Sequence, residues 1–265
     1  MPTNPVHNDE RCALFLDVDG TLLELAATPQ GVQVSERLKE LLVSLSARLG
    51  GALALVSGRS IADLDHLFAP LRLSASGIHG SERRDAEGAI IRPRLDQDRI
   101  EAMRRTLRRF VVENPGLLLE DKGLGIAVHY RSAPTLAAQV RLFMNAVSER
   151  LGPDFVIQTG KCVVEIQPAG HSKGTSIRAF MEEPPFRGRK PIYLGDDVTD
   201  EHGFAAVNAL DGISIRVGDA ATTVARFRLR CVNDVLLWLE RIPLSLTEIG
   251  RGPGPGRVLS PVGRE

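Results

Sequence analysis

Short apolar runs alternate with helical stripes over the first third of the chain. The runs 13–16 and 52–56 are continuous and end at small or polar residues, as buried strands do, and 71–75 is expected to form a third strand. Between them, apolar residues recur at helical spacing over 36–49 and 60–68. Strands that alternate with helices predict a parallel, doubly wound α/β sheet, which binds ligands at the carboxyl ends of its strands.

The pattern changes after residue 82 and returns after residue 170. Hairpins and alternating strands beside helices predict an antiparallel α+β domain, inserted into the α/β domain. In this segment we expect a hairpin at 83–92, helices at 97–112 and 135–151, and strands at 117–120, 125–130, 155–158 and 162–167. Beyond it we expect helices at 173–181, 199–207 and 235–242 and strands at 192–194 and 212–217.

These patterns predict how the chain is divided. We expect an N-terminal tail at 1–11, an α/β core formed by 12–82 and 171–245, and an inserted cap at 83–170. The glycine- and proline-rich stretch 250–256 cannot hold regular structure, so we expect 246–265 to be a flexible tail.

Composition narrows the functional classes. Lysine plus arginine and aspartate plus glutamate both number 33, and this balance argues against a nucleic-acid or anionic-membrane partner. The start of the chain lacks the apolar segment of a signal peptide, and no apolar run has the length of a membrane span, so we expect a cytoplasmic protein. The separated cysteines Cys12, Cys162 and Cys231 are expected to be buried free thiols.

Two carboxylates follow the first apolar run. In an extended chain Asp17 and Asp19 point to the same side, where they repel each other unless a cation lies between them or one is protonated. A hard divalent ion such as Mg²⁺ meets that need. Gly20 can adopt positive φ beside a ligand, and Thr21 offers a hydroxyl. An ordinary strand-to-turn exit explains the same residues about equally well.

Other predicted strand ends supply matching groups. Ser57 follows the second strand and could bind a phosphoryl oxygen or simply begin a helix. Lys173 opens a helix, where the dipole favours anions, although a single lysine is more often a solvated surface residue. Asp196, Asp197 and Asp200 crowd one strand-to-helix turn; helix capping explains Asp200 but hardly the other two.

Together these groups suit phosphoryl transfer, which requires positioning and charge stabilisation. Asp17, Asp19 and Asp196 could hold Mg²⁺, while Ser57 and Lys173 receive phosphoryl oxygens. Asp17 lies deepest in the strand and is the predicted nucleophile. Asp19 is then the predicted general acid and later the general base.

The motifs also resemble those of a known superfamily. Residues 17–21, Ser57, Lys173 and 195–197 look like the four motifs of the haloacid dehalogenase (HAD) superfamily of phosphohydrolases. Over about 12–242 the closer resemblance is to trehalose-6-phosphate phosphatases, and it rests on 56–59, 77–82, 119–123, 127–131 and 195–201. The resemblance implies Mg²⁺-dependent hydrolysis of trehalose 6-phosphate through an aspartyl phosphate, in trehalose biosynthesis.

In that family the inserted domain is a mobile cap whose polar residues bind the sugar. By motif match, the resemblance implies that Glu120, Lys122 and Glu165 contact the substrate, with His129 and Arg131 as further candidates. A polar sheet face would explain these residues without the resemblance. The full set of expected substrate-binding residues is Gly20, Thr21, Gly58, Arg59, His79, Glu120, Lys122, His129, Arg131 and Glu165, with Asp197 and Asp200 in support.

Several alternatives remain at this point. A phosphatase for sucrose phosphate or for a glycosyl phosphoglycerate shares the core chemistry, and a phosphomutase shares the nucleophile. A phospho-accepting signalling receiver also has an acidic metal pocket. It needs neither Asp19 nor an insertion of about 90 residues, far longer than an ordinary loop. We expect a monomer that acts on a small sugar phosphate.

Overall fold

The computed structural model describes residues 12–25, 33–160, 162–219, 222–242 and 260–262. Its larger sheet has the order β13-β12-β11-β10-β1-β2-β3-β4-β5. β1 pairs with β10 on one side and with β2 on the other, so the strand before Asp17 lies at the centre. The parallel strands are β1 (Cys12–Leu16), β2 (Leu53–Val56), β3 (Ser74–Gly77), β10 (Lys190–Gly195), β11 (Ile213–Val217) and β12 (Phe227–Leu229).

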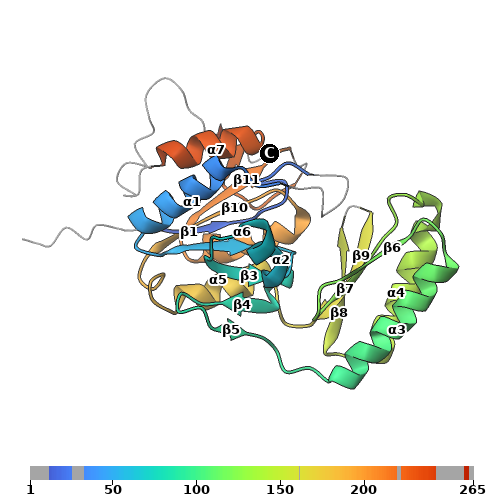
Figure 1. Ribbon diagram of the computed structural model, residues 1–265. Helices are drawn as coiled ribbons and strands as arrows, with labels where there is room; N and C mark the ends of the chain where they lie inside the picture. The colour runs from blue at the N-terminus through green and yellow to red at the C-terminus, as the bar shows by residue number, and fades with distance from the viewer. Residues whose placement is uncertain (1–11, 26–32, 161, 220–221, 243–259, 263–265) are drawn as a thin grey trace, which may run out of the picture.

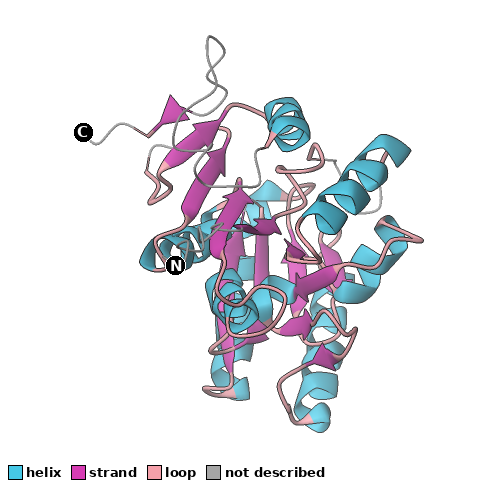
Figure 2. Ribbon diagram, turned by 90° about the vertical axis from the view of Figure 1, so that its left-hand side faces the viewer, coloured by secondary structure: helices cyan, strands magenta, loops and turns pink. Residues whose placement is uncertain are grey.

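Helices cover both faces of this core sheet. α1 (Glu36–Arg48) and α7 (Val232–Arg241) pack together above it in Figure 1, whereas α5 (Lys173–Met181) lies below and contacts α6 (Glu201–Ala209). Figure 2 shows the strands flanked by helices. α2 (Ile61–Leu67) also belongs to the core and contacts β3. The sequence explains where α1 begins and which face is buried. The Ser35 hydroxyl caps the helix by accepting the Leu38 N–H, and the buried leucines face the sheet.

A separate four-stranded antiparallel sheet packs with two helices to form the inserted domain, at the right of Figure 1. Its order is β6-β7-β9-β8, and its hydrophobic cluster, with stacked Phe110 and Phe143 rings, is separate from that of the core. The elements are β6 (Leu118–Asp121), β7 (Ile126–His129), β8 (Phe155–Gly160), β9 (Val163–Pro168), α3 (Gln97–Glu113) and α4 (Ala137–Leu151). The predicted fold class, a doubly wound core with an α+β cap, is confirmed.

The predicted hairpin exists but was assigned to the wrong sheet. β4 (Glu82–Arg84) and β5 (Ile90–Ile91) extend the edge of the core sheet through β3. Ion pairs and hydrogen bonds explain why the charged strand β4 can be buried there: Arg84 binds both Asp65 oxygens and the Leu73 carbonyl, and Arg83 binds Glu183. The change to cap structure therefore comes after this hairpin.

The chain ends and the cysteines follow the sequence-based expectations only in part. Within the segment expected to be flexible, β13 (Ser260–Pro261) pairs antiparallel with β12; segments 1–11, 243–259 and 263–265 lie outside the described residues. All three cysteines are free, but only Cys12 is buried and Cys231 is exposed. In the described part of the chain, every helix is too short or too polar to cross a membrane.

Candidate active site

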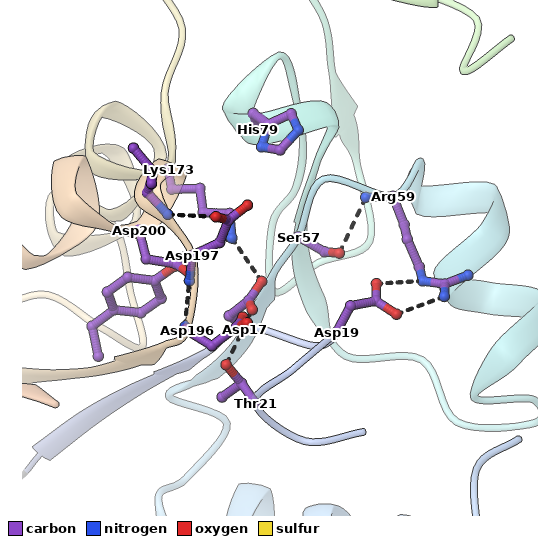
Figure 3. A network of polar contacts seen from close by, with 12 residues as sticks. Asp17, Asp19, Thr21, Ser57, Arg59, His79, Lys173, Asp196, Asp197 and Asp200 are labelled. Atoms are coloured by element: carbon purple, nitrogen blue, oxygen red, sulfur yellow. Dashed lines mark hydrogen bonds and ion pairs between the residues drawn. The ribbon is translucent and has the colours of Figure 1, made fainter. Parts of the chain in front are cut away.

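Asp17 lies directly after β1, at the carboxyl edge of the core sheet, and Figure 3 shows the groups around it. It is 3% exposed, and its backbone N–H donates to the Leu194 carbonyl of β10. The Lys173 ammonium donates to Asp17 Oδ1 at 2.7 Å, and the Thr21 hydroxyl donates to Oδ2 at 3.1 Å. Thr21 was predicted to bind substrate; in the structure it is fully buried and orients Asp17.

Gly20 allows the turn after β1 to approach the opposite loop. Its φ is +82°, and a Cβ placed there would lie 2.1 Å from Asp196 Oδ2. Only glycine provides both the positive φ and the space. The turn thus brings Asp17 and Asp196 close to each other.

Asp17, Asp196 and Asp200 form an acidic cluster in which one oxygen of each lies within 4.8 Å of the others. The Asp200 oxygens are already occupied: they accept hydrogen bonds from Lys173, the Tyr193 hydroxyl and the backbone N–H groups of Asp196 and Asp197. Asp196 Oδ1, in contrast, is buried without a hydrogen-bond partner among the described residues. Asp17 and Asp196 are therefore the carboxylates suited to a cation, and Asp200 holds Lys173 and the backbone of Asp196 in place beside them.

Asp19 does not join this cluster, contrary to the prediction that its carboxylate would share the ion. Instead Arg59 Nε donates to Asp19 Oδ2 at 2.7 Å and Arg59 Nη2 donates to Oδ1 at 2.6 Å. Figure 3 shows this pair beside the cluster. A guanidinium matches both oxygens of a carboxylate, and this bidentate contact keeps the carboxylate turned away from the other acids.

Burial and crowding shape the charges of the cluster. Burial first, and then the nearby Asp200 carboxylate, raise the pKa of Asp17 well above its usual value, although Lys173 opposes this. The same two causes raise the pKa of Asp196 to about 6. Burial disfavours the Lys173 ammonium, but Asp17 and Asp200 outweigh it and raise the pKa of Lys173. One ammonium thus faces three carboxylates, an excess of negative charge that a divalent cation would relieve.

Ser57 and Lys173 reach the site from separate elements. Ser57 follows β2, is buried, and its hydroxyl oxygen accepts the Arg59 N–H at 3.1 Å. Lys173 is the first residue of α5, whose start is fixed by a reciprocal capping box between Ser172 and Thr175. Both side chains face the cavity where a phosphoryl group would meet Asp17.

A cavity of about 540 Å³ lies between the core and the cap. Of the predicted residues, Gly20, Thr21, Asp200 and Glu165 are outside its lining and act from behind it. The predicted residues that line it are Asp17, Asp19, Ser57, Gly58, Arg59, His79, Glu120, Lys122, His129, Arg131, Lys173, Asp196 and Asp197.

Cap residues form two ion-paired groups on the far side of this cavity. Lys122 Nζ lies 2.6 Å from Glu165 Oε2, and His79 of the core lies 3.6 Å from the same oxygen. Burial raises the pKa of Glu165, but Lys122 and His79 outweigh it and lower the pKa to about 2. His129 and Glu120 lie 2.7 Å apart; burial opposes ionisation of Glu120, yet His129 and Lys122 lower its pKa.

His79 bridges the two domains from an unusual backbone. It and Ile78 have φ of 52° and 48°, in the left-handed region that non-glycine residues rarely adopt. Hydrogen bonds hold this conformation, because the His79 N–H donates to the Ser57 carbonyl and the Ile78 N–H donates to the Arg59 carbonyl. The imidazole lies over Gly58, where a Cβ would come within 2.6 Å of it. The loop after β2 thus positions His79.

The sequence-based prediction missed Arg216, which lines the cavity from the end of β11. Its guanidinium donates to the Asp197 carbonyl at 3.0 Å and lies 3.4 Å from Glu201. Its place at a strand end, the criterion that identified the other groups, would have found it. Thr199, Leu25, Gly116, Leu118, Ser132, Gly160 and Val163 complete the lining.

Known proteins with similar sequences and folds place this chain in a family. A trehalose-6-phosphate phosphatase of Escherichia coli K12 is 43% identical over 236 residues, covering 89% of this chain and 88% of that protein. A probable trehalose-phosphate phosphatase of Sinorhizobium fredii is 48% identical over 206 residues, covering 78% and 77%.

Solved structures share the fold. The C-terminal domain of a Candida albicans trehalose-6-phosphate phosphatase superposes with a TM-score of 0.75 at 23% identity, covering 88% of this chain and 92% of that one. A phosphatase of the haloalkanoate (HAD) superfamily from Bacteroides thetaiotaomicron gives 0.61 at 18% identity, covering 93% and 98%. The family model of trehalose-phosphatase matches residues 15–232. This chain belongs to the trehalose-phosphatase family, within the HAD fold.

Proposed function

We propose that this protein hydrolyses trehalose 6-phosphate to trehalose and phosphate, in trehalose biosynthesis. Family membership and the trehalose-phosphate phosphatase activity for which the two bacterial relatives are named support this substrate. The observation that carries the chemistry is the arrangement of Asp17, Asp196 and Lys173 at one end of a cavity. Its other wall carries the paired polar residues of the cap.

We further propose that Mg²⁺ is the cofactor. The donor set fits a hard divalent ion, because Asp17 and Asp196 are adjacent oxygen donors and Asp196 Oδ1 is buried without a partner among the described residues. Gly20 leaves the space beside Asp196 that a side chain would fill. When bound, the ion would supply the positive charge that lets a phosphate dianion approach two carboxylates.

The chain's own residues account for the steps. An Asp17 oxygen attacks phosphorus, the bond from phosphorus to the sugar oxygen breaks, and the Asp19 carboxyl gives its proton to that oxygen. Water then attacks the phosphorus of the aspartyl phosphate, Asp19 takes the water's proton, and the bond to Asp17 breaks. Ser57 and Lys173 hold the phosphoryl oxygens during both displacements.

The sugar would lie against the cap. The cavity volume of about 540 Å³ is in the range of small-molecule sites, generally about 300–1,000 Å³. Glu120, Lys122, His129 and Arg131 line that side, and Glu165 orients Lys122 from behind. Hydroxyl groups of a disaccharide suit these donors and acceptors.

A substrate panel tests the proposal. Phosphate release should be measured with trehalose 6-phosphate, sucrose phosphate, a glucosyl phosphoglycerate and glucose 6-phosphate, each with Mg²⁺ and with chelator. We expect Mg²⁺-dependent release, fastest from trehalose 6-phosphate. Faster release from another sugar phosphate would refute the substrate assignment. Transfer of the group to a second hydroxyl without release would indicate a phosphomutase, and a long-lived acyl phosphate would indicate a receiver.

We propose that the enzyme is a cytoplasmic monomer whose cap moves relative to the core, with no nucleic-acid or membrane partner. The balanced charge of 33 basic and 33 acidic residues supports the absence of a polyanionic partner. Light scattering during size-exclusion chromatography tests the monomer, and a mass twice that of the chain would refute it.

A further inference from the structure

We propose that Arg59 is a positioning residue for the general acid Asp19, in place of the sugar-binding role that its motif suggested. The inference rests on the proposed phosphatase chemistry. Its basis is the two-point contact in which Arg59 Nε and Nη2 bind the two Asp19 oxygens at 2.7 and 2.6 Å. Such a contact fixes both the position and the plane of a carboxylate.

The backbone of Arg59 is itself firmly held. Its N–H donates to Ser57 Oγ at 3.1 Å, and its carbonyl accepts the Ile78 N–H at 2.9 Å. The next residue, Ser60, caps α2 by accepting the Asp63 N–H. Arg59 therefore links the predicted acid, which follows β1, to the predicted phosphoryl ligand Ser57, which follows β2.

The Arg59 side chain is largely buried. It is 12% exposed, and although burial disfavours the charged form, Asp19 outweighs that effect and raises the pKa of Arg59. Glu120 on the cap adds to the same effect. Asp19, Arg59 and Glu120 all line the cavity, so the Arg59–Asp19 pair borders the space that the sugar would occupy. In the proposed reaction, the carboxyl held at that place meets the leaving oxygen.

This role makes a prediction that sugar binding does not. A proton donor matters when the leaving oxygen is strongly basic and matters little when it is a stable anion. Loss of Arg59 should therefore reduce the cleavage of esters of weakly acidic alcohols more than esters of strongly acidic ones. Binding of the sugar plays no part if the esters carry no sugar.

The experiment uses the full chain with Mg²⁺ and three aryl esters of rising leaving-group acidity: phenyl, 4-nitrophenyl and 2,4-dinitrophenyl phosphate. Single-turnover release of the phenol isolates the first chemical step. For Arg59→Ala we expect a loss of about 10- to 100-fold on phenyl phosphate and less than about threefold on the dinitrophenyl ester. Arg59→Lys should recover part of the loss, and Asp19→Asn should show the same ordering with a larger amplitude.

Arg84→Ala is the matched control. Arg84 is also buried and also binds both oxygens of an aspartate, Asp65, but it lies outside the cavity lining. Its removal should change all three esters by the same factor. Arg59→Gln replaces Arg59→Ala if the latter does not fold, as judged by circular dichroism.

The outcomes separate the inference from the proposed function. An equal loss on all three esters in the Arg59 variants would overturn the inference, as would unchanged aryl kinetics together with a raised KM for trehalose 6-phosphate. Wild-type protein that releases product from neither the aryl esters nor the sugar phosphates would refute the phosphatase chemistry, and the inference with it.

Discussion

The pairing of Lys122 with Glu165 should hold the cap together, and its contribution can be worked out from the structure. Glu165 is 3% exposed, and the exposed fraction of the Lys122 side chain is 9%, so solvent screens the pair little. Lys122 and His79 outweigh burial and lower the pKa of Glu165 from 4.5 to about 2. At about 1.36 kcal/mol per pKa unit, this difference corresponds to about 3 kcal/mol.

Lys122→Met removes the ammonium and leaves a buried carboxylate. Because the folded-state pKa of Glu165 is depressed, its ionisation stabilises the fold fully above pH 4.5, and this contribution is lost as the pH falls toward 2. We expect the variant to lose about 3 kcal/mol of unfolding free energy at pH 7. The loss should shrink to about 1 kcal/mol at pH 3, since the variant's carboxyl can then take a proton.

Urea unfolding followed by circular dichroism at pH 7 and pH 3 measures these losses, and hydrogen exchange locates them. Amides of β7 and β9 should exchange faster in the variant, while those of β1 and β10 should not. Lys190→Met is the control, because Lys190 lies 3.5 Å from the exposed Asp211 carboxylate and such exposed pairs contribute at most about 1 kcal/mol. A loss below 1 kcal/mol at pH 7, or a loss independent of pH, would refute the reasoning.

The acidic cluster leads to the remaining predictions. Asp17→Asn should abolish release of phosphate from every ester while circular dichroism shows an intact fold; retained turnover would exclude Asp17 as nucleophile. Gly20→Ala should weaken Mg²⁺ binding, measured by calorimetry, at least about tenfold, because the new Cβ would clash with the Asp196 carboxylate. Gly88→Ala is the control, since Gly88 has a similar φ but open space around it. Equal Mg²⁺ affinities of the two variants would contradict the clash. Since burial and Asp200 raise the pKa of Asp196 to about 6, protons should compete with Mg²⁺ below that pH, and an affinity at pH 5 equal to that at pH 7 would exclude this.

Much of the site could be predicted because a parallel sheet gathers distant residues by a simple rule. Asp17, Ser57 and Asp196 each follow a buried apolar run, and the carboxyl ends of parallel strands meet at one edge. Lys173 completes the set from the start of α5, after the cap. Their approach required only that the runs be strands of one sheet, which continuous apolar patterns indicate well.

The predictions that were wrong also have simple physical explanations. The same-side argument for Asp17 and Asp19 holds only in an extended chain, but β1 ends at Leu16, and by Gly20 the backbone has positive φ. β3 begins three residues later than expected. Its residues Ser74–Gly77 are buried but have no large apolar side chains, so the hydrophobic pattern did not indicate the strand. The hairpin partner of β3 was likewise unpredictable, since its burial depends on ion pairs between residues distant in sequence.

The distribution of charge indicates how the two ends of a substrate would be distinguished. Around Asp17 the carboxylates outnumber the ammonium, so this end favours a cation together with phosphate, whatever the sugar. On the cap, Glu120 contacts His129 and Lys122 pairs with Glu165, and these groups offer a neutral sugar hydrogen-bond geometry. A site built on such bonds rejects ligands that lack the matching hydroxyls, because buried polar groups would then stay unpaired. Discrimination among sugar phosphates should therefore reside in the cap, and exchanging cap residues should change the preferred ester while the chemical steps at Asp17 stay the same.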